Sequence, residues 1–343
     1  MDNQYDVNTI FNFLCKQYTT SQIANKLNVN NGTVRRWQDL HNVPDNYIFD
    51  LLKMANIDID YSLFSYKDKD QFFTSKKMAQ ECIDITFDFL EEYINLNNYT
   101  FIEPAAGNGA FFDLLPDPKI GLDIENFNND NILIQDFLEY YPPKGKYITI
   151  GNPPFGLRGQ KALQFMQHAF EFSDFVAFIL PPLFNSDGRG TPKKRVGYYL
   201  VYNKNLTDKV FYYPDDKKVN VNSIFQIWSK YDIGIDLNET IEPIGYKVYS
   251  LSNGGTPATT RNLDKLDKCD FYLPSTVFGI NNMKLYPSFE DLPQQRGYGI
   301  ILEDKNIGNI IEKINWQEKG FLSTNNAINL RTSIIVKAIE TAK

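Results

Sequence analysis

An asparagine, two prolines and a phenylalanine follow a strongly apolar run in YITIGNPPFG, positions 147–156. The apolar run predicts a buried strand, and Pro153 and Pro154 cannot continue a strand or a helix. They predict a rigid corner at the carboxyl end of the strand, where open α/β sheets bind ligands. The side-chain oxygen of Asn152 and the carbonyl of Pro153 can hold both N–H groups of a planar amine. Phe155 can stack on an extruded base, so this segment predicts chemistry on an exocyclic amine.

Two glycines follow an earlier apolar run in YTFIEPAAGNGAF, positions 99–111. Residues 100–102 predict a strand, Gly107 and Gly109 predict a tight turn, and a helix is expected to begin near Ala110. Glycines let a ligand approach the backbone, and the first turn of a helix donates N–H groups. The Gly-x-Gly pair alone fits a dinucleotide site or a structural turn equally well.

Carboxylates come after the next two apolar runs. Asp123 follows residues 120–122 in KIGLDIEN, and Asp136 follows residues 132–134 in ILIQDFLEY. A carboxylate at the end of a strand can accept hydrogen bonds from ribose hydroxyls. Asp123 and Glu125, which are two positions apart, are both available for that contact. Each carboxylate taken alone also fits an exposed residue at a strand end.

The phrase E-P-A-A-G-N-G-A-F, positions 103–111, resembles the first cofactor-binding motif of S-adenosylmethionine-dependent N6-adenine methyltransferases. A further segment, DQFFTSKKMAQECIDITFDFL at positions 70–90, contains Thr74. The chain order resembles that of the gamma group of amino methyltransferases: the Thr74 segment comes first, followed by the glycine loop, Asp123, Asp136 and Asn152. The resemblance covers roughly residues 70 to 230. It implies an α/β fold with a Rossmann-like seven-stranded sheet, S-adenosylmethionine as cofactor, and methyl transfer to N6 of an adenine flipped out of double-stranded DNA.

The same resemblance implies roles for particular residues. The ribose contact falls on Asp123, with Glu125 as the second choice. Asp136 accepts from the adenine amine of the cofactor, and Phe137 packs on the adenine ring. Thr74, which is expected to cap a helix, contacts the methionine end, although Ser75 stands where the family commonly has proline. Tyr213, in a predicted hairpin, is the candidate for stacking on the second face of the flipped base. The expected cofactor contacts are Thr74, Glu103, Pro104, Ala105, Gly107, Gly109, Asp123, Ile124, Asp136, Phe137 and Asn152, and the expected catalytic segment is Asn152, Pro153, Pro154 and Phe155.

The segment TTSQIANKLNVNNGTVRRWQ, positions 19–38, predicts two short helices separated by a turn. Val34 and Trp37 fall on an inward face, and Arg35 and Arg36 point outward. The pattern resembles the helix-turn-helix of DNA-binding proteins, whose second helix enters the major groove. It predicts DNA contact through the two arginines. The alternative is a helical hairpin that packs on the catalytic domain.

Three regions of the chain differ in their apolar patterning and composition. Residues 1–65 predict a small helical domain, residues 66–230 the catalytic domain, and residues 231–343 a mixed, loop-rich domain for target recognition. A loop containing Gly188 and Gly190 is a further candidate for phosphate contact. In the last region the candidates for phosphate contact are Arg261, Lys265, Lys268, Lys284 and Arg296.

Composition narrows the class of protein. The 343 residues carry a formal net charge of −7, which argues mildly against a nucleic-acid partner, although a local basic face is sufficient. Three scattered cysteines and two histidines do not fit a disulfide framework, a zinc site or a Ser-His-Asp triad, so no metal is expected. No signal peptide or membrane-spanning run is visible, which predicts a soluble cytoplasmic protein that lies on the nucleoid when bound to DNA.

Other functions share parts of this pattern. RNA guanine-N2 methyltransferases and protein glutamine methyltransferases also carry Asn-Pro-Pro-aromatic motifs, because each must hold a planar amino group. A catalytically inactive, DNA-binding regulator is an alternative from another class. The adenine-methyltransferase hypothesis includes a restriction–modification system whose cognate nuclease is a separate chain.

Overall fold

The computed structural model describes residues 5–186, 191–206, 210–238, 241–256, 259–279, 281–323 and 326–343. Gly188 and Gly190 therefore lie outside the described residues. The chain divides into two compact units. The first consists of Met1–Leu180, Asp208–Asn220 and Ile227–Lys230, and the second of Pro181–Thr207, Val221–Gln226 and Tyr231–Lys343.

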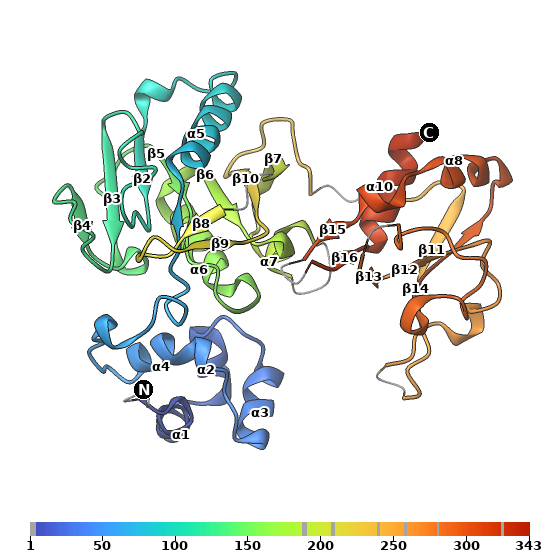
Figure 1. Ribbon diagram of the computed structural model, residues 1–343, viewed down its shortest axis with the longest axis horizontal. Coiled ribbons are helices and arrows are strands. Elements are labelled where there is room, and N and C mark those ends of the chain that lie inside the picture. The colour runs from blue at the N-terminus through green and yellow to red at the C-terminus, as the bar shows by residue number, and fades with distance from the viewer. Residues whose placement is uncertain are drawn as a thin grey trace. The chain divides into compact units, whose positions relative to one another are not determined.

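A seven-stranded sheet in the order β4-β3-β2-β5-β6-β10-β7 is the central element of the fold (Figure 1). Its strands are β2 (Thr100–Glu103), β3 (Lys119–Asp123), β4 (Ile132–Ile134), β5 (Tyr147–Gly151), β6 (Ser173–Leu180), β7 (Tyr199–Asn205) and β10 (Ile224–Ser229). Strands β4, β3, β2, β5 and β6 pair in parallel. The predicted seven-stranded α/β fold is confirmed. The chain order reverses between β2 and β5, which is where a doubly wound sheet opens a crevice for ligands.

Burial explains why these segments form strands and helices. Every residue of β5 is buried, as expected for a central parallel strand covered on both faces. Ser75 is the N-cap of helix α5 (Lys76–Leu90), and its side chain accepts a hydrogen bond from the N–H of Met78. The ring of Phe87 on α5 lies 5.1 Å from that of Phe101 on β2, so this helix packs on the sheet. Helix α6 (Gln160–Phe172) connects β5 to β6.

Four helices form the N-terminal region, α1 (Val7–Gln17), α2 (Thr20–Lys26), α3 (Asn31–Leu40) and α4 (Ile48–Met54). They share one hydrophobic core drawn from residues 7–64. Thr19 caps α2 in a capping box, and Asn30 caps α3. Val34 and Trp37 of α3 are buried, whereas Arg35 and Arg36 are exposed, as the pattern predicts. Contact of the two arginines with DNA stays a prediction.

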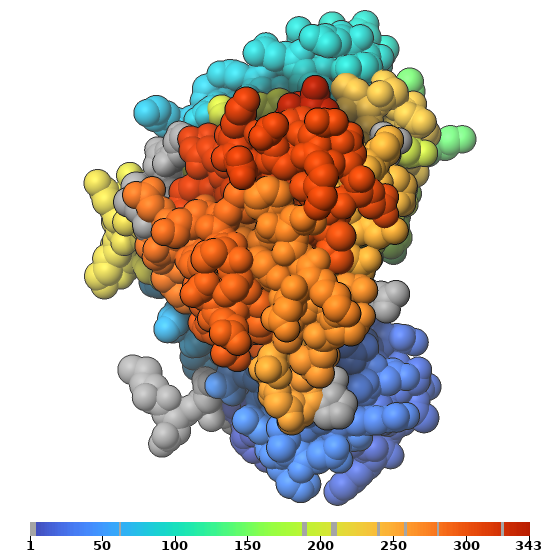
Figure 2. All heavy atoms as spheres, turned by 90° about the vertical axis from the view of Figure 1, so that its right-hand side faces the viewer, coloured from blue at the N-terminus to red at the C-terminus, as the bar shows by residue number. Residues whose placement is uncertain are grey.

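The second unit carries two small antiparallel sheets, β11-β14-β12 and β13-β16-β15, whose part of the chain is coloured orange to red in Figure 2. The strands are β11 (Tyr246–Ser252), β12 (Phe271–Pro274), β13 (Thr276–Val277), β14 (Arg296–Leu302), β15 (Phe321–Leu322) and β16 (Ile328–Asn329). The helices are α7 (Pro192–Arg195), α8 (Gly308–Lys313), α9 (Trp316–Lys319) and α10 (Thr332–Ala342). Tyr246, Ile300, Leu330 and Ile339 lie in its main hydrophobic core. Within the described residues, no helix is both long and apolar enough to cross a membrane.

Candidate functional site

Four parallel strands end at one cavity of about 160 Å³ in the first unit. Each strand is followed by residues that line it. They are Pro104, Ala105 and Gly107 after β2, Asp123 and Ile124 at β3, Gln135, Asp136 and Phe137 after β4, and Asn152, Pro153, Pro154 and Gly156 after β5. The structure therefore brings together most of the residues that the sequence predicts for the cofactor and the catalytic segment.

The glycine loop after β2 is held by a carboxylate of the next strand. The N–H of Gly107 donates to Oδ2 of Asp123 over 2.7 Å. Gly107 has a φ of 53°, and a Cβ there would lie 2.9 Å from the ring of Phe73. Both constraints require glycine at this position. The backbone thereby approaches the cavity closely, as a ligand-binding loop requires.

The helix expected to begin near Ala110 is absent, so that prediction is wrong. Residues 107–115 form consecutive turns instead. Gly109, with a φ of 84°, blocks a helix on one side. On the other side Pro116 disfavours helical backbone at Leu115. Between these positions the N–H groups of Asp113 and Leu115 donate to the carbonyls of Gly109 and Phe111, so the segment forms separate turns and no continuous helix.

Glu103 supports this loop and does not line the cavity. Its carboxylate is 2% exposed and accepts from the N–H of Phe112 over 2.6 Å. Burial raises the pKa of Glu103 well above its ordinary value of 4.5, although the hydrogen bond from Phe112 opposes that change. The structure thus places Glu103 behind the loop. The expected direct contact with cofactor stays a prediction.

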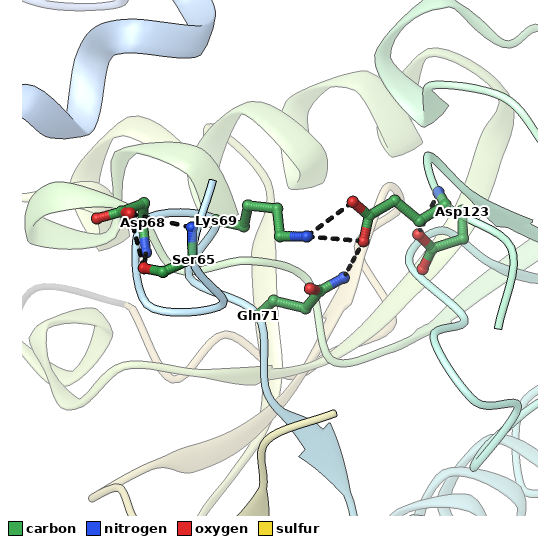
Figure 3. A network of polar contacts seen from close by, with 6 residues as sticks. Ser65, Asp68, Lys69, Gln71 and Asp123 are labelled. Carbon is green, nitrogen blue, oxygen red and sulfur yellow. Dashed lines mark hydrogen bonds and ion pairs between the residues drawn. The ribbon is translucent and has the colours of Figure 1, made fainter. Parts of the chain in front are cut away.

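Asp123 and Glu125 face different surroundings. Asp123 lines the cavity, and burial raises its pKa. The carboxylate of Glu125 instead accepts hydrogen bonds from Nζ of Lys69 over 2.7 Å and from Nε2 of Gln71 over 3.1 Å (Figure 3). The side chain of Lys69 is only 6% exposed, so this ion pair is largely shielded from water. Of the two carboxylates, Asp123 is the one placed to meet a ligand in the cavity.

Both carboxylate oxygens of Asp136 have partners in the protein. Oδ1 accepts from the N–H of Leu138 over 2.9 Å, and Oδ2 pairs with Nζ of Lys53 on α4. The neighbouring Phe137 is 1% exposed, and its ring lies 5.2 Å from that of Phe165 on α6. Asp136 therefore meets a cation of the N-terminal region, which sequence analysis did not predict.

The N-terminal helical region also supplies part of the cavity wall. Its lining residues are Leu27, Asn46, Tyr47, Phe49, Asp50, Lys53 and Tyr61. Asp50 on α4 pairs with Lys161 on α6 at 2.8 Å, beside the pair of Lys53 and Asp136. Burial lowers the pKa of Lys53, and the neighbouring charge of Lys161 adds to that effect. The partners are 83 and 111 residues apart in the chain, so no local pattern could reveal them.

Asn152 lines the cavity. Its Oδ1 is inaccessible to water and has no hydrogen-bond partner. The loop that follows is held by Asp70, whose Oδ2 accepts from the N–H of Gly156 over 2.6 Å. Burial raises the pKa of Asp70, whereas the hydrogen bonds from Gly156 and Phe155 lower it. Asp70 lines the same cavity and was not predicted from the sequence.

Phe155 is 6% exposed, and its ring meets that of Phe72 edge-on at 5.4 Å. In this structure Phe72, not Phe155, lines the cavity beside Asn152. Stacking of Phe155 on a base stays a prediction, and it requires Phe72 to move aside.

Thr74 lies in β1 (Phe73–Thr74), which pairs with β8 (Val210–Tyr212) of a hairpin completed by β9 (Lys218–Asn220). The helix cap expected of Thr74 belongs to Ser75, so that prediction is wrong by one residue. Serine at this position accepts from a helix N–H, as an N-cap does. Tyr213 begins the turn between β8 and β9, and its N–H donates to the carbonyl of Lys217 over 2.9 Å. Neither Thr74 nor Tyr213 lines the cavity.

The second unit contains a separate cleft of about 760 Å³ with a basic lining. The described charged residues that line it are Lys193, Lys194, Arg261, Lys319, Arg331 and Lys337, against Glu242 and Glu318. Amide side chains of Asn185, Asn203, Asn205 and Asn238 lie among them. Of the five cations predicted to meet phosphate in residues 231–343, only Arg261 belongs to this cleft.

No protein-family model and no curated protein matches the chain. Among solved structures, it is similar to a candidate RNA methyltransferase from Pyrococcus horikoshii, with 19% identity, 47% of this chain and 88% of that chain covered, and a TM-score of 0.35. A type I restriction–modification methyltransferase subunit from Streptococcus thermophilus shows 14% identity, coverage of 54% and 53%, and a TM-score of 0.34. Magnesium protoporphyrin IX methyltransferase from Synechocystis shows 12% identity, coverage of 55% and 99%, and a TM-score of 0.33. Likenesses this weak carry no inference about activity.

The buried carboxyl of Glu103 generates a prediction about stability and pH. Because its pKa is raised in the folded protein, its contribution to stability is present below about pH 4.5 and is lost as the pH rises toward the folded value. Glu103→Gln removes this loss of stability, because glutamine does not ionise as the pH rises. Urea unfolding at several pH values should therefore show the variant gaining stability relative to the parent as the pH rises above 4.5. Glu92→Gln, the same exchange at an exposed position, is the control. A difference between Glu103→Gln and the parent that does not change with pH contradicts the assignment.

Proposed function

We propose that this chain is an S-adenosylmethionine-dependent methyltransferase that methylates N6 of adenine in double-stranded DNA. The observation that carries the proposal is the buried, unpartnered Oδ1 of Asn152 at the end of β5. A buried acceptor without a donor costs stability, so its retention indicates that a ligand supplies the donor. An exocyclic amine is such a donor.

The residues present fit the cofactor. Gly107 lines the cavity in a turn whose positive φ favours glycine, and Asp123 lines it with a carboxylate for ribose hydroxyls. Asp136 and Ile124 also line the cavity. An apolar side chain together with a carboxylate suits an adenine ring that carries an amine. S-adenosylmethionine, when bound, supplies an electrophilic methyl group on a sulfonium.

In the proposed reaction Asn152 and the carbonyl of Pro153 each accept one N–H of the target amine. These hydrogen bonds orient the nitrogen lone pair toward the methyl carbon. The nitrogen–carbon bond forms as the carbon–sulfur bond breaks, and the nitrogen then releases a proton to water. Asp70 positions the segment by holding the N–H of Gly156. No side chain has to remove a proton before the transfer.

The basic cleft of the second unit supports a nucleic-acid substrate. Its six cations lie in a chain whose net charge is −7, so positive charge is concentrated there against the overall balance. Lysine and arginine contact phosphates, and asparagine can read adenine edges. We propose that this cleft binds duplex DNA, and that a cognate restriction nuclease, if one pairs with this chain, is a separate protein.

Asn152→Ala tests the catalytic assignment. The variant should bind S-adenosylmethionine with nearly the parent affinity, because Asn152 is proposed to act on the target amine. Methyl transfer to duplex DNA should fall by at least about a hundredfold, since the variant retains only one of the two orienting acceptors. Cofactor affinity is measured by calorimetry, and transfer with radiolabelled cofactor on DNA of mixed sequence. Turnover close to that of the parent removes Asn152 from the mechanism. Transfer by the parent to RNA or to a glutamine side chain, and not to DNA, would favour the corresponding alternative substrate.

Replacing Lys319 and Lys337 by glutamine tests the cleft. For each lysine that binds a DNA phosphate, the replacement should lower the slope of log affinity against log salt concentration by about 0.9, and affinity should fall on every sequence alike. Filter binding or fluorescence anisotropy from low to moderate salt measures both quantities. Lys247→Gln with Lys313→Gln changes the net charge equally at lysines outside the cleft. An equal effect of the two pairs would place DNA binding elsewhere.

A further inference from the structure

Unpartnered amide oxygens gather around the candidate cofactor cavity. Five buried side-chain oxygens of the described residues lack a hydrogen-bond partner, and three of them belong to residues that line this cavity. The three are Gln71, Asn152 and Gln164. Burial of an acceptor without a donor is unfavourable, so three at one cavity indicate donors that a ligand provides. The proposed reaction uses only Asn152, which leaves the two glutamines to explain.

Gln164 lies at the Asp136 end of the cavity. It stands on α6 between Lys161, which pairs with Asp50, and Phe165, whose ring lies 5.2 Å from that of Phe137. Asp50 and Lys53 are one turn apart on α4, and Lys53 pairs with Asp136. The residues on either side of Gln164 are thus tied to Asp136 and its neighbour. This is the end at which the proposed function places the adenine of the cofactor.

Gln71 contacts the segment that carries Asp123. Its Nε2 donates to Glu125 over 3.1 Å, and Glu125 follows the carboxylate proposed for the ribose, Asp123 (Figure 3). The two glutamines therefore face different parts of a bound nucleoside.

Asp136 alone does not satisfy an adenine amine well in this structure. One of its oxygens accepts from the N–H of Leu138, and the other pairs with Lys53. An amine brings two N–H groups, and a second acceptor is needed for the other one. The buried carbonyl oxygen of Gln164 has no competing donor.

We propose that Gln164 accepts a hydrogen bond from the exocyclic amine of the cofactor's adenine, beside Asp136. This inference rests on the proposed use of an S-adenosyl cofactor. It makes Gln164 a determinant of specificity for adenine over bases with a 6-oxo group, because an oxo group offers no donor to the amide oxygen.

The test measures, by calorimetry, the affinity of the full chain for S-adenosylhomocysteine and for its 6-oxo analogue S-inosylhomocysteine. The parent should prefer the adenosine ligand. Gln164→Met should weaken that ligand about tenfold, equivalent to about 1.4 kcal/mol, and change the inosine ligand little. Gln164→Glu keeps an acceptor and should keep the preference. Gln80→Met makes the same change at an exposed residue of α5 that does not line the cavity, and should alter neither affinity.

A purely structural role of Gln164 predicts equal weakening of both ligands, and that result overturns the inference, as does no change for either. A parent that binds both ligands equally also overturns it while leaving the cofactor proposal intact. A folded parent that binds neither ligand removes the proposed cofactor itself, and the inference with it.

Discussion

The arrangement of the site depends on one buried acceptor, the side-chain oxygen of Asn152. An unpartnered buried carbonyl costs about 1–3 kcal/mol, and the surrounding structure has to hold it in place. The fully buried strand β5 sets its position, and Asp70 fixes the loop that follows by accepting from the N–H of Gly156 over 2.6 Å. The carboxylate of Asp123 holds the facing glycine loop through Gly107. Asp70 and Asp123 thus fix the backbone around the cavity, whereas the side-chain oxygen of Asn152 has no partner in the protein.

The N-terminal helical region contributes to this cavity through α4. Its Asp50 and Lys53 form ion pairs with Lys161 and Asp136, so two charges from outside the sheet complete the polar wall. The exposed Arg35 and Arg36 lie on α3 of the same region. The helix that lines the cavity and the helix that carries the two arginines proposed for DNA contact are therefore different, so the two proposed roles are compatible. Cofactor binding is accordingly expected to be sensitive to this region as well as to the motifs of the sheet.

The sequence predicts the features that depend on local pattern and chain order. Apolar periodicity and turn residues predict the individual strands, the residues at their ends and the exposed face of α3, whereas the seven-stranded sheet and the gathering of Gly107, Asp123 and Asn152 at one site were expected from the family resemblance. What it does not predict depends on distant partners. Asp70 and Gly156 are 86 residues apart, and neither residue has an unusual neighbourhood in the chain. The helix expected at Ala110 is replaced by separate turns between Gly109, whose φ is positive, and Pro116, and this outcome depends on backbone angles. The sequence does not single out Gln164, because it is an ordinary glutamine on an amphipathic helix. Only the three-dimensional structure shows that its side-chain oxygen is buried without a donor.

The central claim is that the acceptor of Asn152 serves adenine N6 in DNA. Sequencing that detects N6-methyladenine, applied to DNA from cells that express the chain and from cells that carry an empty vector, tests it most directly. The account predicts methylated adenine within one short sequence context, present only when the chain is expressed. The same DNA without any additional N6-methyladenine, from cells in which the folded protein is shown to bind S-adenosylmethionine, would contradict it.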